Sequence, residues 1–117
     1  MELREWYHVL ISEDGFSLAV APPDRKPWQA KIHWDDIIRV CFKAEDFLVS
    51  DGIYVFIKQR PESFAIPSEA DGSDLLIGEL LKRKLFDAEL MIQAASAKSG
   101  VFCWPPEAGV PSKPQDK

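Results

Sequence analysis

The chain has no asparagine, few cysteines and no long apolar run. Without asparagine it has no acceptor for an N-linked glycan. Its longest apolar run, Ile53 to Ile57, has five residues, whereas a membrane-spanning helix needs about 20. The opening residues MELREWYHVLISEDG lack the basic start, the apolar stretch and the small-residue cleavage site of a secretory signal. We therefore expect a cytoplasmic protein.

Sequence signatures of the common enzyme classes are missing as well. There is no G-x-S-x-G elbow, no G-x-x-x-x-G-K-[ST] or G-x-G-x-x-G phosphate loop and no C-x-x-C pair. His8 and His33 fall in predicted strands with apolar neighbours, where an imidazole is more often a surface or hydrogen-bonded group than a general base. We expect no catalytic residue unless one of them faces a cleft beside a carboxylate.

Residue types that ligate metals do not form a recognised pattern. Cys41 and Cys103 each lie inside an apolar run, where we expect reduced thiols packed as small hydrophobes. His33 with Cys41 supplies two ligands at a spacing that matches no zinc motif. The acidic pairs are expected to be solvated because they fall in predicted turns: Glu13 with Asp14, Asp35 with Asp36, and Glu45 with Asp46. We assign no metal and no cofactor.

Charge and length limit the partner and the domain count. A net charge of −5 opposes nucleic acid, whose binding draws on Lys and Arg contacts with phosphate, and it weakens attraction to an anionic membrane. The chain of 117 residues, 46% apolar, is sufficient for one domain, which we place at residues 1–104. The tail 105–117 is rich in proline and lacks aromatic residues, so we predict it to be disordered.

Period-two alternation predicts strands in the first part of the chain. WYHVLI and FSLAV, joined by the turn SEDG, indicate a hairpin, and WQAKIHW alternates cleanly after the proline-rich loop 21–27. IIRVCF is expected to place Ile38, Val40 and Phe42 on one face, opposite Ile37, Arg39 and Cys41. Short strands are then expected in FLVS, IYVFI and SFAI. IYVFI is apolar on both faces, which suits a central strand covered on both sides.

After Pro67 the period becomes helical. A stripe of apolar residues predicts a first helix: Leu76, Ile77, Leu80, Leu81 and Leu85. Its expected cap is Ser68 with Asp71, or Asp71 with Asp74, and Lys82 to Lys84 stand near its end. DAELMIQAASAK predicts a second helix, and VFCW a last short strand or a packed strap. Strands followed by helices indicate an α+β fold.

Part of this pattern resembles a known family. IHWDDIIRVCFKAEDFLVSDGIYVFI and, after a short strand, PSEADGSDLLIGELL are similar to small, mostly uncharacterised bacterial domains with a W-x-D-I turn, a D-x-I strand and an E-x-x-G helix entry. Those domains look like pleckstrin-homology (PH-like) barrels. The resemblance, over about residues 32–81, implies a strongly bent antiparallel sheet or PH-like barrel of about six or seven strands, followed by one or two C-terminal helices.

The resemblance implies structural roles for the matching residues. It assigns Trp34 to Ile37, with Asp35 and Asp36, to a turn, Asp51 and Ile53 to the entry of a central strand, and Glu69 with Gly72 to the start of the helix. The segment LFDAELMIQAASAKSG is longer than such a module needs. Its apolar face either packs on the chain's own sheet, which we slightly favour, or forms a homodimer through Leu90–Ala97.

The loop PDRKPWQAK is the best candidate for recognition. Arg25 and Lys26 stand beside Trp28, and a basic pair with an aromatic ring suits a phosphate headgroup or an acidic peptide. The alternative is that Trp28 packs into the sheet while the two basic residues are solvated.

We therefore expect a non-enzymatic binding or adaptor module that engages another protein through a sheet edge, this loop or the second helix. Two alternatives stay open. One is an immunity-type inhibitor of a basic toxin, which the acidic charge suits. The other is a binder of a small ligand or a phospholipid headgroup.

Overall fold

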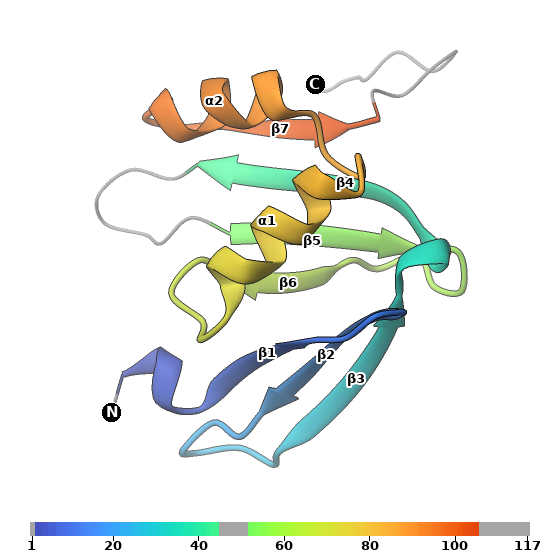
Figure 1. The fold of residues 1–117 in the computed structure, drawn as a ribbon. Coiled ribbons are helices and arrows are strands. Elements are labelled where there is room, and N and C mark those ends of the chain that lie inside the picture. Colours follow the sequence, from blue (N-terminus) through green and yellow to red (C-terminus); the bar gives the residue numbers. More distant parts are fainter. Residues whose placement is uncertain (1, 45–51, 106–117) are drawn as a thin grey trace.

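The computed structural model describes residues 2–44 and 52–105. Figure 1 shows an α+β fold, as predicted, in which the helices follow six of the strands. The strands are β1 (Tyr7–Ile11), β2 (Gly15–Val20), β3 (Trp28–His33), β4 (Ile37–Ala44), β5 (Gly52–Ile57), β6 (Phe64–Pro67) and β7 (Gly100–Trp104). The helices are α1 (Ser73–Lys82) and α2 (Ala88–Ser96), and short 3-10 turns at Leu3–Glu5 and Trp34–Asp36 precede β1 and β4.

The strands β1, β2 and β3 form one antiparallel sheet in that order. Side chains that share a register also share a face, so Val9 and Leu18 are buried while Leu10 is exposed on the outer side. The hairpin and the third strand are confirmed. Trp34, expected as the last residue of the third strand, lies instead in the 3-10 turn that leads to β4.

The second sheet has the order β6, β5, β4, β7 and is also antiparallel. The central position of β5 is confirmed, and its Ile53, Val55 and Ile57 are buried. Tyr54 and Phe56, on the other face, are only half-buried. Full cover on both sides was therefore wrong, because α1 and α2 both pack on the Ile53 side.

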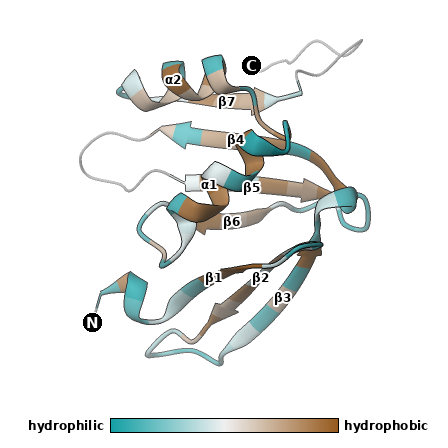
Figure 2. Cartoon of the chain, in the orientation of Figure 1, coloured by the Kyte–Doolittle hydropathy of each residue, from teal (hydrophilic) through white to brown (hydrophobic). Residues whose placement is uncertain are grey.

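One core lies between the two sheets and α1. Figure 1 shows α1 passing across β5 and β6, with the first sheet below them. Leu76 and Leu80 of α1 are buried in this core together with Phe16 and Ile66 from the two sheets. Figure 2 shows brown, apolar segments on the strands and on α1. Within the described residues the two sheets stay separate and do not close into a barrel.

An irregularity at the start of β4 changes which side chains face the core. The register between β4 and β5 shifts between Ile37 and Arg39. A β-bulge of this kind adds one residue and reverses the faces before it. Ile37 is therefore buried with Val40, and Ile38 is exposed. The predicted grouping of Ile38 with Val40 was wrong for this reason.

A backbone bridge at Asp71 joins the start of α1 to the first sheet. The Asp71 N–H donates to the Tyr7 carbonyl at 2.9 Å, and the Val9 N–H donates to the Asp71 carbonyl at 2.7 Å. The predicted side-chain caps were wrong. The N-cap of α1 is Gly72 with no side-chain hydrogen bond, and the Asp71 carboxylate bonds to His8 instead.

The 3-10 turn Trp34–Asp36 forms the corner between the two sheets. The Trp34 indole N–H donates to the Glu13 carbonyl at 3.0 Å, and the Arg83 guanidinium lies 4.5 Å from the centre of its ring. Arg83 also bonds to Glu79 at 3.0 Å. The charged end of α1 therefore contacts the corner as well as solvent.

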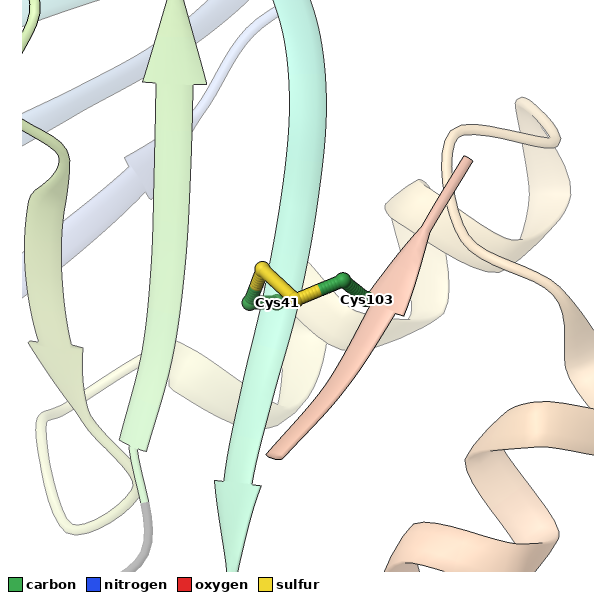
Figure 3. Close-up of a disulfide and its surroundings, with 2 residues drawn as sticks. All are labelled: Cys41 and Cys103. Carbon is green, nitrogen blue, oxygen red and sulfur yellow. A yellow bond between two sulfur atoms is a disulfide. The ribbon is translucent and has the colours of Figure 1, made fainter. Parts of the chain in front are cut away.

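The two cysteines are joined, not reduced as we predicted. Cys41 and Cys103 face each other across β4 and β7 and form a disulfide, with their Cα atoms 4.0 Å apart (Figure 3). Apolar neighbours alone suggested buried thiols, whereas pairing depends on VFCW lying beside β4. Disulfides persist mainly in oxidising compartments. This bond therefore gives no support to the cytoplasmic location, which stays a prediction.

The second helix packs on its own sheet, as we favoured. Ala94 is buried, and Leu90, Met91 and Ala97 pack against the core, whereas Ala95 is exposed. Asp87 caps the helix by accepting from the Leu90 N–H at 2.9 Å. The homodimer stays a prediction. No helix in the described ranges has the length and apolar character needed to cross a membrane. The predicted FLVS strand and nearly all of the predicted tail lie outside these ranges.

Replacing Gly72 by alanine should destabilise the fold. Gly72 has a φ of 87°, and a Cβ there would collide with the Val9 carbonyl oxygen. We expect Gly72→Ala to lower the free energy of unfolding by about 1–3 kcal/mol. Gly78 in the same helix is the control, because no atom lies within 4 Å of its added Cβ, and Gly78→Ala should stabilise by about 0.5–1 kcal/mol. Denaturant unfolding measures both. Equal stability of the two variants would contradict the collision.

Reduction of the disulfide should destabilise the protein by about 2–4 kcal/mol, since the bond closes a long loop across 62 positions of sequence. Thermal unfolding with and without reductant measures this. The control is the double variant Cys41→Ala with Cys103→Ala, whose melting temperature should not respond to reductant. Two thiols titrated in the unreduced, denatured protein would show that the bond is not formed.

Candidate functional site

The loop between β2 and β3 carries the predicted site residues. Its prolines at 22, 23 and 27 restrict the backbone, and the Arg25 N–H donates to the Pro22 carbonyl at 3.4 Å. Arg25, Lys26 and Trp28 are all exposed at this end of the first sheet. Within the described residues, neither basic side chain makes a hydrogen bond or an ion pair. Both charges are therefore available to a partner.

Trp28 lies on the core-facing side of β3 but is only partly covered. It shares a register with Val20 and Tyr7 and keeps 42% of its surface exposed. Its ring and that of Tyr7 pack in a T-shaped arrangement, with centroids 6.2 Å apart and an angle of 85° between the ring planes. The Tyr7 hydroxyl donates to the Ala65 carbonyl at 2.7 Å, and burial raises its pKa to about 12. Trp28 therefore packs against a hydrogen-bonded ring and keeps a large part of its own surface open to solvent.

The strand after this loop adds to the positive charge. Lys31 is exposed in the middle of β3, and its ammonium is 3.8 Å from the Asp14 carboxylate. Both side chains are more than half exposed, so water weakens their attraction. Segment 21–33 has three basic residues and one acidic residue, Asp24, in a chain of net charge −5. The positive charge is local.

One histidine does stand beside a carboxylate. His8 Nδ1 is 2.9 Å from Asp71 Oδ2, and Nε2 is 3.2 Å from the Glu5 carbonyl. The hydrogen bond to Asp71 raises the His8 pKa above its usual 6.5. Both ring nitrogens are engaged, which leaves neither free to take a proton from a substrate. We interpret the pair as a link between β1 and the start of α1. His33 is exposed on β3.

Among the described residues, no three His, Cys, Asp or Glu side chains lie close enough together to hold a metal ion. An apolar hollow between the second sheet and the two helices holds a cavity of about 10 Å³ and is lined by residues such as Val40, Ile77 and Met91. Ligand pockets usually have about 300–1,000 Å³ and a few polar groups. This hollow suits side-chain packing.

A comparison of the chain with protein-family models, curated proteins and solved structures finds no match. The PH-like resemblance thus stays a prediction.

The sequence did not identify two residues of the site, Tyr7 and Lys31. Tyr7, which supports Trp28, is distant in sequence, and only the strand order brings it near. Lys31 occupies an outward position of WQAKIHW, so the period-two pattern already exposes it. The period-two pattern does not predict that β3 lies at the edge of its sheet.

The His8 pair should make stability depend on pH. A raised folded-state pKa means that this stabilisation is fully present below pH 6.5 and is lost as the pH rises through the folded-state value. Asp71→Asn should return the His8 pKa towards 6.5 and weaken this dependence. An NMR titration of the His8 imidazole ring measures this pKa in the wild type and in Asp71→Asn. The signal of His33 in the same spectrum is the internal control. An unchanged His8 titration in Asp71→Asn would exclude the carboxylate as the cause.

Proposed function

We propose that the chain is a non-enzymatic binding module that recognises an acidic region of another protein with the loop before β3. The observation that carries this proposal is the pair of unpartnered cations at Arg25 and Lys26 beside the half-exposed Trp28. Unpaired cations lose no internal ion pair when they bind an anion, and tryptophan and arginine supply much of the energy of protein interfaces.

Restraints on this region also support recognition. Three prolines restrict the backbone of the loop, and the Trp28 ring packs against Tyr7. A surface that is already ordered loses less conformational entropy on binding than a flexible one. A protein partner is favoured over a membrane because the rest of the chain is acidic and would be repelled by an anionic bilayer.

The test is capture of partners from the lysate of the source cells by the tagged protein, compared with variants of equal charge change. The site variant is Arg25→Glu with Lys26→Glu and Trp28→Ala. The control is Lys82→Glu with Lys98→Glu, because both of these lysines are exposed on or after the helices. We expect a stoichiometric protein that the wild type and the control retain and the site variant loses by about tenfold or more.

Other outcomes would overturn this proposal. A protein that all three forms retain equally would place the interface elsewhere on the chain. Capture of no protein, together with salt-sensitive sedimentation on vesicles containing phosphoinositide, would favour binding of a phospholipid headgroup instead. Circular dichroism and thermal unfolding of each variant check that the fold is kept.

A further inference from the structure

The direction of the backbone groups along β3 follows from one hydrogen bond. The Trp34 N–H donates to the Asp14 carbonyl at 3.0 Å, at the position that continues the register of His33 with Gly15. In an antiparallel pair, residues bonded to the partner alternate with residues that point away from it. The residues of β3 whose N–H and C=O groups point away from β2 are therefore Gln29, Lys31 and His33.

The opposite edge of the sheet confirms this alternation. The Ser12 N–H donates to the Gly15 carbonyl at 2.9 Å, so the same rule turns the backbone groups of Tyr7 and Val9 away from β2. Those two residues are the ones that bond to Asp71. One edge of the sheet is thus occupied, and a single bridged residue is enough to hold a neighbouring segment there.

The outer edge of β3 has no partner strand within residues 2–44 and 52–105, where β3 pairs with β2 alone. It has six residues, whereas the edge strands β6 and β7 of the second sheet have four and five, and β6 ends in Pro67, which has no N–H to donate. An open edge of this length can pair with an extended segment of another chain.

Charge decides what kind of segment fits. Lys31 lies at the middle of the edge, with Arg25 and Lys26 beyond its start, and the acidic residues near them are Asp24 and the weakly paired Asp14. Two copies that paired through this edge would bring these cations together, which is unfavourable. Acidic side chains opposite Lys31 would instead be attracted. Figure 2 marks the polar residues of β3 in teal.

The core-facing side of the β3 edge favours apolar side chains in an added strand. Trp28, Ala30 and Ile32 point towards the core, and Ala30 and Trp28 remain partly exposed there. Since successive residues of a strand point to opposite faces, an added strand would present apolar residues to Trp28 and Ala30 and acidic residues to Lys31.

We propose that the β3 edge adds an extended segment of a partner protein in which acidic and apolar residues alternate. The inference deepens the proposed function and rests on it, because the same loop cations and Trp28 flank the added strand. It names backbone pairing with Gln29, Lys31 and His33 as the mode of recognition.

The probe is a blocked octapeptide of alternating glutamate and valine, titrated into the full-length protein labelled with ¹⁵N. A peptide of alternating lysine and valine is its matched control. We expect the acidic peptide to shift the amide signals of β3 and to slow hydrogen exchange at Gln29, Lys31 and His33, while the amides of β6 and β7 stay unchanged. Binding should weaken as salt rises, and the basic peptide should cause no shift.

Two substitutions at one position separate backbone pairing from charge. Lys31→Pro removes an N–H that points outwards, so the bonds to β2 remain, and it should weaken the peptide by about tenfold or more. Lys31→Glu keeps the edge but reverses its charge and should weaken the peptide by about fivefold. Lys98→Glu, after α2, is the charge control and should bind as the wild type does.

The outcomes distinguish this inference from the proposed function. Shifts at Arg25 to Trp28 without slower exchange at the β3 amides, and a captured partner that Lys31→Pro still retains, would overturn strand addition and leave the loop as the interface. Equal binding of acidic and basic peptides would overturn the charge argument. No shift at millimolar peptide would overturn the inference even where partner capture still depends on the loop.

Discussion

The exchange of backbone hydrogen bonds between Asp71 and β1 is the constraint on which the architecture depends. It satisfies groups of β1 that would otherwise be unpaired, with bonds of 2.7 and 2.9 Å. To make them, the chain must pass so close to Val9 that only glycine fits at position 72. The helix that starts there, beside β1, then passes across β5 and β6 (Figure 1), with Leu76 and Leu80 buried in the core. A local backbone requirement thereby sets where the main core forms.

The other end of α1 is held by a different kind of contact. Arg83, just after the helix, lies over the Trp34 ring, and the indole of Trp34 bonds back to the β1–β2 turn at Glu13. The helix is thus tied to the first sheet at both of its ends, once through the edge of β1 and once through the corner before β4. These two ties leave β3 as the edge of the first sheet that nothing in the described chain occupies.

Local patterns predicted the elements well and their partners poorly. Period-two alternation located β1 to β3 and the core of β5, and helical spacing located α1 and α2, because those signals depend on neighbouring residues. The pairing of Cys41 with Cys103 and of Asp71 with His8 spans more than sixty positions, so no local pattern contains it. The bulge at Ile38 arises where β4 leaves the corner. Arg25, Lys26 and Trp28 could be predicted as a loop site because they are neighbours in the sequence. The role of Lys31 depends on the order of the strands, which no local pattern contains.

The positive charge at the β3 edge limits which extended chains can pair with this unpaired strand. An unpaired strand edge invites any extended chain, and natural proteins limit this risk with an exposed lysine on the edge. In the proposed strand addition, Lys31 disfavours pairing with a second copy, whose own β3 carries the same charge. In the proposed strand addition the same lysine, with Arg25 and Lys26, attracts an acidic strand to this edge, although the chain has a net charge of −5. In this proposal, unfavourable self-pairing and recognition of an acidic partner depend on the same cations, since both depend on the sign of the charge that the edge meets.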